Sequence, residues 1–452
     1  MNARATIAPT RREFLGQLVR RPWRYPWSVL AVLLLVGIIG FAAYFAGCQV
    51  WGEIHYRAAL RCIERATSSQ TQENLEKALD HLKSCLKVRP QSVDTHFLAA
   101  RTARRLHLYE EAKAHLSLCE KLGGLPEVIA LEQALIRVQH ADLESEGFLW
   151  ACVEKDHPDK LLILEALALG YLQMYRFNNA LAALDLWLKD QPNALQAYVW
   201  RAELHKRLSS SEYTNAIQDS EQALALDPNC DLARLNLAEV LLHKNRARDA
   251  AVQFASLIER QPGNVAPVLG LARCKHLLGE TEEAGKLFDR LLRDNPENPE
   301  ILSESAKLLL SMKQFSDAEQ RLRTSLRLAP YEREALFDMS RCLELQGRKA
   351  EAQKYLDEYN RVEKDMETLK EVTRTIRESG KNPGMRREAA RILLRNGKAS
   401  DALKWLGSAL LEDGQNAETW LLMADCYQQL GKPAEAAVCR ARARRLQRGL
   451  LP

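Results

Sequence analysis

Residues 161–194 read LLILEALALGYLQMYRFNNALAALDLWLKDQPNA, and this stretch decides the fold. In its first half, the apolar residues from Leu164 to Tyr171 recur at the spacing of one face of an α-helix. After a short turn, a second apolar face runs from Ala180 to Trp187. Pro192 then ends the pattern, because proline cannot continue a helix. The stretch therefore predicts two helices joined by a turn.

Small residues repeat this unit along the chain. One series lies in the predicted second helices, mostly 34 residues apart with Glu146 taking one place: Ala78, Ala112, Ala180, Ala216, Ala250, Ala284, Ala318, Ala352, Ala402 and Ala436. The other lies in the first helices: Ala66, Ala100, Ala134, Ala168, Ala202, Ala238, Ala272, Ala306, Ser340, Ala390 and Ala424. Such a period is typical of one stacked unit. We predict an all-α superhelical solenoid of about eleven helical hairpins.

The pattern resembles the tetratricopeptide repeat. That family has leucine and a small residue in the first helix, then alanine and a large apolar residue in the second, and proline at the end. Residues 231–262 match with Leu237, Ala238, Leu241, Ala250, Phe254, Leu257 and Pro262. The resemblance implies a scaffold or adaptor that binds proteins through a concave groove lined by the first helices.

The N-terminus predicts a membrane anchor. Residues 28–47, SVLAVLLLVGIIGFAAYFAG, carry no charge and would span about 30 Å as a helix, which is the thickness of the hydrocarbon core. Six arginines precede this span, whereas only Arg57 and Arg61 follow closely. By the positive-inside rule, residues 1–27 are a basic cytoplasmic tail and the repeats lie in the periplasm, anchored in the inner membrane.

Three features leave alternatives open. Residues 10–15 resemble a twin-arginine export signal, and residues 45–48 resemble a lipoprotein cleavage box. Ten cysteines without a Cys-x-x-Cys pair favour a reducing compartment, and hence an organelle-anchored receptor facing the cytosol. An accessory subunit of an enzyme or secretion complex is a further alternative.

Repeats extend over residues 51–362, about nine units, and two more occupy residues 383–448. Between them, residues 363–382 predict a helical extension and a break at Ser379–Gly384. Apolar residues spaced by three and four mark this long helix: Tyr359, Val362, Met366, Leu369, Thr373 and Ile376. We expect the stripe to pack back on the solenoid; self-association through residues 355–376 is the alternative.

No motif for catalysis is present. The chain lacks a phosphate-binding glycine loop, a nucleophile elbow and a His-Glu-x-x-His pair, and its cysteines and histidines lack zinc-ligand spacing. Outside residues 1–50, 58 basic residues balance 58 acidic ones, so net charge does not indicate nucleic acid. We expect no enzyme, no cofactor and no metal.

The resemblance places candidate partner-binding residues on the concave side. The basic and acidic candidates are Arg101, Arg105, Glu203, Lys206, Glu239 and Arg273. The apolar candidates are Leu131, Leu135, Val138, Leu169 and Leu172, which we expect to be exposed. The overall expectation is a membrane-anchored scaffold, acting in envelope complex assembly.

Overall fold

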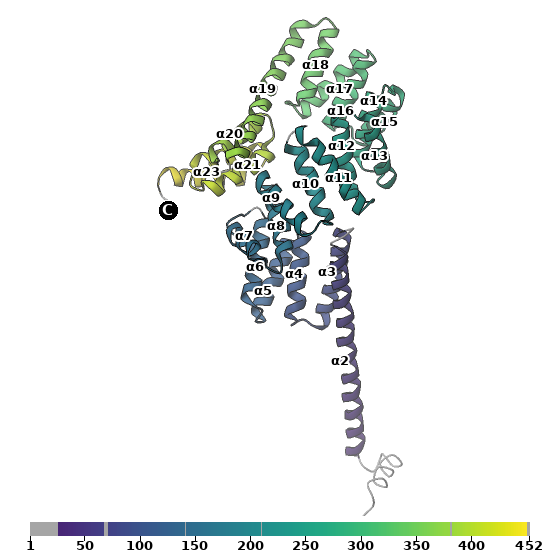
Figure 1. The fold of residues 1–452 in the computed structure, drawn as a ribbon, viewed down its shortest axis with the longest axis vertical. Helices are drawn as coiled ribbons and strands as arrows, with labels where there is room; N and C mark the ends of the chain where they lie inside the picture. Colours follow the sequence, from purple (N-terminus) through teal and green to yellow (C-terminus); the bar gives the residue numbers. More distant parts are fainter. Residues whose placement is uncertain (1–25, 67–70, 141, 209, 380–381, 450–452) are drawn as a thin grey trace, which may run out of the picture. The chain divides into compact units, whose positions relative to one another are not determined.

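The computed structural model describes residues 26–66, 71–140, 142–208, 210–379 and 382–449. These residues contain 22 α-helices, α2 to α23, one short 3₁₀ helix and no strand. The helices follow one another as eleven pairs, in agreement with the predicted solenoid (Figure 1).

The chain divides into two compact units, with the boundary after Ile129 in helix α6 (Pro126–Gln139). The remaining helices of the N-terminal unit are α2 (Pro26–Arg65), α3 (Thr71–Val88), α4 (Val93–Arg105) and α5 (Tyr109–Lys121).

The C-terminal unit continues with α7 (Glu146–Glu154), α8 (Lys160–Gln173), α9 (Phe177–Asp190), α10 (Leu195–Leu208), η2 (Ser210–Glu212), α11 (Tyr213–Leu226), α12 (Asp231–His243), α13 (Ala247–Arg260), α14 (Val265–Leu277), α15 (Thr281–Asp294), α16 (Pro299–Ser311), α17 (Phe315–Leu328), α18 (Arg333–Leu345), α19 (Lys349–Ser379), α20 (Pro383–Arg395), α21 (Ala399–Glu412), α22 (Ala417–Gln429) and α23 (Pro433–Gln447).

Both alanine series lie in the core. Every alanine in the two series is buried, and so is Ser340 at 6% exposure. The series mark places where helices cross too closely for a larger side chain. Glycine serves the same purpose at Gly170 of α8, where an added Cβ would lie 2.4 Å from the Val138 carbonyl oxygen of α6. Close packing of this kind fixes the register of each repeat.

A left-handed residue joins the two helices of most repeats. Gly279, Gly347 and Gly431 take φ angles of 79°, 79° and 70°, which glycine adopts without strain. At equivalent turns Tyr175 and Lys313 adopt φ of 53° and 60° despite their side chains. This geometry costs free energy in non-glycine residues, and for Tyr175 the contacts described below offset it.

Helix α2 combines the predicted anchor with the start of the repeats. Its 40 residues form one unbroken helix, about 60 Å long at 1.5 Å per residue. The part from Leu30 is long and apolar enough to cross a membrane, and its side chains, such as Phe41 at 70%, are exposed. Toward the other end, the Arg89 guanidinium Nε donates to the Gln49 side chain at 2.8 Å. No flexible linker therefore separates this span from the first repeat. Residues 1–25 of the predicted basic tail lie outside the described residues.

Helix α19 is a single helix of 31 residues that includes residues 363–379 of the predicted helical extension. Its apolar stripe packs within the chain: Val362 and Ile376 are 2% and 6% exposed, and Ile376 joins a core cluster with Trp405 of α21. Because these side chains are covered by the same chain, the structure favours packing on the solenoid over self-association through this stripe.

The C-terminal unit curves so far that residues more than 200 positions apart in sequence meet. The Tyr175 hydroxyl donates to the Asp401 carboxylate at 3.0 Å, and the rings of Tyr175 and Trp405 lie 5.1 Å apart. Beside them, the Glu412 carboxylate lies 3.4 Å from Arg176 and 3.0 Å from Arg386. We call Arg176, Arg386 and Glu412 the clasp. All three side chains are under 10% exposed, so the clasp is a buried ion cluster between distant repeats.

Candidate binding groove

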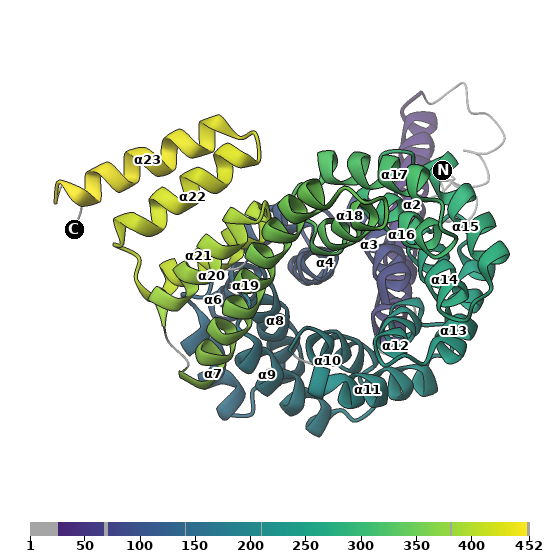
Figure 2. The ribbon, with the colours of Figure 1, turned by 90° about the horizontal axis from the view of Figure 1, so that it is seen from above.

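The first helices of successive repeats line the inner side of the C-terminal unit. Figure 2 shows α10, α12, α16 and α18 on the inner side of the curve and α11, α13 and α17 on the outer side. Each first helix also contacts the first helix of the next repeat, from α10 to α18. Side chains on their free faces therefore form one continuous concave surface.

Lys206 of α10 joins two repeats at this surface. Its ammonium lies 2.5 Å from the Glu203 carboxylate and 2.7 Å from the Glu239 carboxylate of α12. It also donates to the Asn236 side chain at 2.9 Å. Burial acts to lower the pKa of Lys206, but the hydrogen bonds to Glu203 and Glu239 outweigh it and raise that pKa. The structure thus brings together three of the predicted groove residues and keeps the lysine charged.

Arg273 of α14 makes the next link. Its Nη2 lies 2.8 Å from the Glu300 carboxylate and 3.2 Å from the Glu304 carboxylate, both on α16. Lys307 pairs with Glu304 as well, at 2.8 Å. The acidic partners of Arg273 were not among the predicted site residues, because their position opposite Arg273 depends on how two repeats stack.

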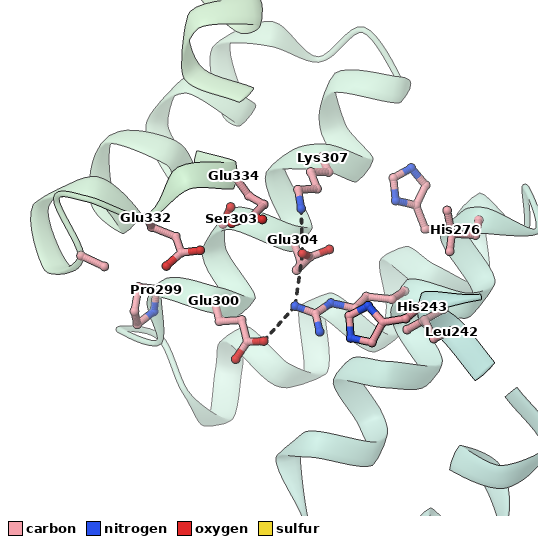
Figure 3. Close-up of a pocket in the computed structure, with 13 residues that line it drawn as sticks. Leu242, His243, His276, Pro299, Glu300, Ser303, Glu304, Lys307, Glu332 and Glu334 are labelled. Carbon is pink, nitrogen blue, oxygen red and sulfur yellow. Dashed lines mark hydrogen bonds and ion pairs between the residues drawn. The ribbon is translucent and has the colours of Figure 1, made fainter. Parts of the chain in front are cut away.

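A cavity of about 620 Å³ opens beside Arg273. Its lining comes from α12, α14, α16, the loop between α17 and α18, and the first turn of α18: Leu242, His243, Arg273, His276, Leu277, Pro299, Glu300, Ser303, Glu304, Lys307, Ala329, Glu332 and Glu334. Figure 3 shows Glu332, Glu334 and Ser303 together on one side, His243 and His276 on the other, and Glu304 with Lys307 between them. A volume of this size is in the range of ligand-binding pockets.

Acidic groups dominate one side of this cavity. Burial, together with the neighbouring Glu334 carboxyl, raises the pKa of Glu332 to about 7. Burial also acts to raise the pKa of Glu334, but hydrogen bonds from Glu332 and Arg333 outweigh it and lower that pKa. Both shifts favour a proton on Glu332 rather than on Glu334. Burial likewise raises the pKa of Asp338, which lies beside them on α18, to about 6.

The expected apolar docking face needs a correction. Leu131, Leu135 and Val138 are only 3%, 0% and 0% exposed, so the prediction that they are exposed in the groove is wrong. They lie on the face of α6 that α8 covers, and the missing side chain of Gly170 lets the two helices approach closely. Leu169 and Leu172 are half-buried, and Leu172 packs against the same core cluster.

Arg101 and Arg105 belong to α4 of the N-terminal unit. Both are half-buried, and the Arg101 guanidinium lies 4.9 Å from the centre of the Phe97 ring. They stay candidates for binding within that unit.

Two histidine pairs were missed by sequence reasoning. The Nδ1 atoms of His55 and His81 lie 2.9 Å apart, and those of His96 and His115 lie 3.0 Å apart. The partners come from different helices, 26 and 19 positions apart, and no local motif signals such pairs. Within the described ranges, no group of three or more His, Cys, Asp or Glu side chains could hold a metal ion.

Comparison with known proteins identifies the repeats. The family model "Tetratricopeptide repeat" matches residues 207–262, 244–308, 309–371 and 393–447. The Protein CTR9 homolog of Arabidopsis thaliana is 30% identical over 104 residues, which are 23% of this chain and 10% of that protein. The matched stretch thus spans about a tenth of the length of this curated relative.

Solved structures with a similar arrangement include the human IFIT1 dimer with m7Gppp-AAAA, which is 15% identical at a TM-score of 0.39 and covers 79% of this chain and 90% of that one. PilW, a type IV pilus biogenesis factor, is 21% identical at a TM-score of 0.39 and covers 43% of this chain and 90% of its own.

Proposed function

Because the chain belongs to the tetratricopeptide repeat family, we propose that it is a membrane-anchored scaffold that docks a segment of a partner protein on its concave face. In this proposal the chain carries no enzymatic activity, needs no cofactor and does not bind nucleic acid. Its action is to hold partners together in an envelope complex.

The cavity beside Arg273 carries the proposal. It opens on the concave face and offers both apolar and charged contacts to one docked segment. Leu277 lines it and is 61% exposed, although large apolar side chains are usually covered in a solenoid core. The charged residues Glu203, Lys206, Glu239 and Arg273 extend the same face along several repeats. A partly apolar concave site with fixed polar groups suits an extended or helical peptide.

The anchor is the apolar part of α2, residues 28–47. Residues 1–27 would form a cytoplasmic tail, with the repeats of residues 51–362 and 383–448 in the periplasm beyond an inner membrane. The charge difference across the span supports this orientation. A reporter that is active only in the periplasm, fused after Pro452, should be active; activity of a cytoplasm-only reporter there would reverse the orientation.

Partner capture tests the docking function. The full chain, extracted from native membranes after chemical cross-linking, should carry a reproducible protein partner. Leu277→Ser should lose this partner, because it removes an apolar contact on the groove while leaving the core intact. Val252→Ser is the matched control, since Val252 is 65% exposed on the outer helix α13. Equal capture by both variants, or equal loss in both, would contradict the groove assignment.

The cysteines favour a second candidate function. All ten are free, and six of them are buried. Free thiols in such number suit a reducing compartment, so a receptor facing the cytosol from an organelle membrane is the alternative. The reporter fusion decides between the two orientations. The role of an accessory subunit in an enzyme or secretion complex would show in the identity of the captured partner.

A further inference from the structure

Two buried polar groups beside the cavity have no partner in the described part of the chain. Ser303 lines the cavity and is 3% exposed, and its hydroxyl makes no hydrogen bond there. Asp338 of α18 is 6% exposed, and its Oδ2 also has no hydrogen-bond partner. Asp338 lies four residues after Glu334 on α18, and therefore on the same face of that helix, and Glu334 lines the cavity. Since buried polar atoms are normally hydrogen-bonded, these two are available to hydrogen-bond to a bound group.

The cavity is lined by four acidic side chains and by two permanently basic ones, Arg273 and Lys307. Arg273 already pairs with Glu300 and Glu304, and Lys307 pairs with Glu304. Glu334 pairs with Arg333 at 2.8 Å. Within the described ranges, Glu332 and Asp338 have no ion pair. Burial is the largest cause of the raised pKa of both carboxyl groups, and it outweighs the nearby Lys398 at Glu332 and the nearby Lys307 and Arg341 at Asp338, which act to lower the pKa.

A group that binds these atoms must be positive and must donate several hydrogen bonds. An anion would be repelled by the carboxylates, and among the described residues no group of three or more His, Cys, Asp or Glu side chains could hold a metal ion. A guanidinium group fits, because it is planar, always charged and carries five N–H donors. The apolar wall formed by Leu242 and Leu277 can cover the methylene stem of the same side chain.

We propose that this cavity binds an arginine side chain of the docked partner protein, with the guanidinium between Glu332, Ser303 and Asp338. This assignment rests on the proposed docking function, which it sharpens by naming the residue that the partner must present. The occupant is a segment of another protein rather than a free metabolite, because the cavity is open to the continuous concave face and is larger than one side chain requires. The site thereby differs from one that would hold a peptide carboxylate, because carboxylates dominate the side formed by Glu332 and Glu334.

A peptide array tests the proposal. The full chain in detergent is applied to short peptides of random sequence that carry arginine, lysine, citrulline or glutamate at one fixed position. Arginine peptides should be enriched at least about tenfold over citrulline peptides, which keep the shape and lose the charge. Lysine peptides should fall between them, because an ammonium is charged but does not present a planar fork. Binding of arginine and citrulline peptides to the same extent would overturn the proposal.

Paired variants locate the binding. Glu332→Gln combined with Asp338→Asn removes both carboxylates at constant volume, and a glutamine at position 332 can still donate a hydrogen bond to Glu334. This double variant should lose the preference for arginine, whereas the control Glu351→Gln, on the exposed start of α19, should keep it. An arginine preference that survives the double variant would also overturn the proposal.

The experiments distinguish a failure of the arginine site from a failure of the docking function. If the wild-type chain captures its native partner but the array shows no arginine preference, the arginine site is wrong and the scaffold function stands. If neither native partner nor peptide binds, both are wrong.

Discussion

Removing the Glu412 side chain should loosen the C-terminal unit far more than removing an exposed carboxylate. Glu412 is 3% exposed, and its two oxygens accept from the Arg386 Nε at 3.0 Å and from the Asn382 backbone N–H at 2.9 Å. Arg176 approaches at 3.4 Å. Glu412→Ala leaves two buried guanidinium groups without this carboxylate. Breaking a buried ion pair from one side typically costs about 3–5 kcal/mol.

The structure favours the lower end of this range of unfolding free energies. Arg176 keeps a second carboxylate, Glu146, at 3.6 Å, so it is partly compensated. Arg386 lies closer to Glu412 than Arg176 does, and burial lowers the pKa of its guanidinium. We therefore expect about 3 kcal/mol, mostly from Arg386. Glu412→Gln should lose less, because an amide oxygen still accepts from Asn382.

Urea denaturation of the full chain, followed by far-ultraviolet circular dichroism, measures this loss. In a solenoid, stability otherwise comes from neighbouring repeats, whereas the clasp joins repeats 236 residues apart. Glu412→Ala should lower the midpoint and broaden the transition. Glu351→Ala is the control, because its ion pair with Arg348 is exposed to water. If both variants unfold at the same urea concentration, the clasp does not stabilise the contact between the distant repeats.

Three further changes test other parts of the structure. Gly170→Ala should destabilise the chain by about 1–3 kcal/mol in the same assay, because its Cβ would meet the Val138 carbonyl oxygen at 2.4 Å; an unchanged midpoint would contradict the α6–α8 packing. Lys313→Gly should stabilise it by up to about 1 kcal/mol, since φ of 60° suits glycine; a loss of stability would show that the lysine side chain matters there. Asp338→Asn should stabilise the chain at pH 7.5 by up to about 3 kcal/mol, because the pKa of Asp338 rises from 3.8 to about 6 on folding. The native state then binds more protons than the unfolded state between about pH 4 and 6, so stability falls as pH rises through that window. The advantage of the asparagine should vanish at pH 4, and an equal gain at both pH values would refute the titration of Asp338.

The sequence by itself determined the repeat. Helix periodicity, turn residues and close-packing alanines are local signals, and each recurs about every 34 residues. The boundaries of the repeats can therefore be assigned even where one position departs from the pattern. The alanines of both series are buried as that register requires, and α19 continues through residues 363–379 of the predicted helical extension. The apolar span at residues 28–47 is equally local, because twenty uncharged residues suffice to recognise it.

Only the tertiary structure decided which side chains face the groove. Leu131, Leu135 and Val138 occupy first-helix positions that the family pattern leaves open, yet the close approach of α8 at Gly170 buries them. The pairing of Arg273 with Glu300 and Glu304 depends on the stacking of adjacent repeats. The clasp depends on the small rotations of many repeats added together, which brings Arg176 to Glu412. Sequence periodicity fixes each unit, but the sum of those rotations is set by the packing at every interface between repeats.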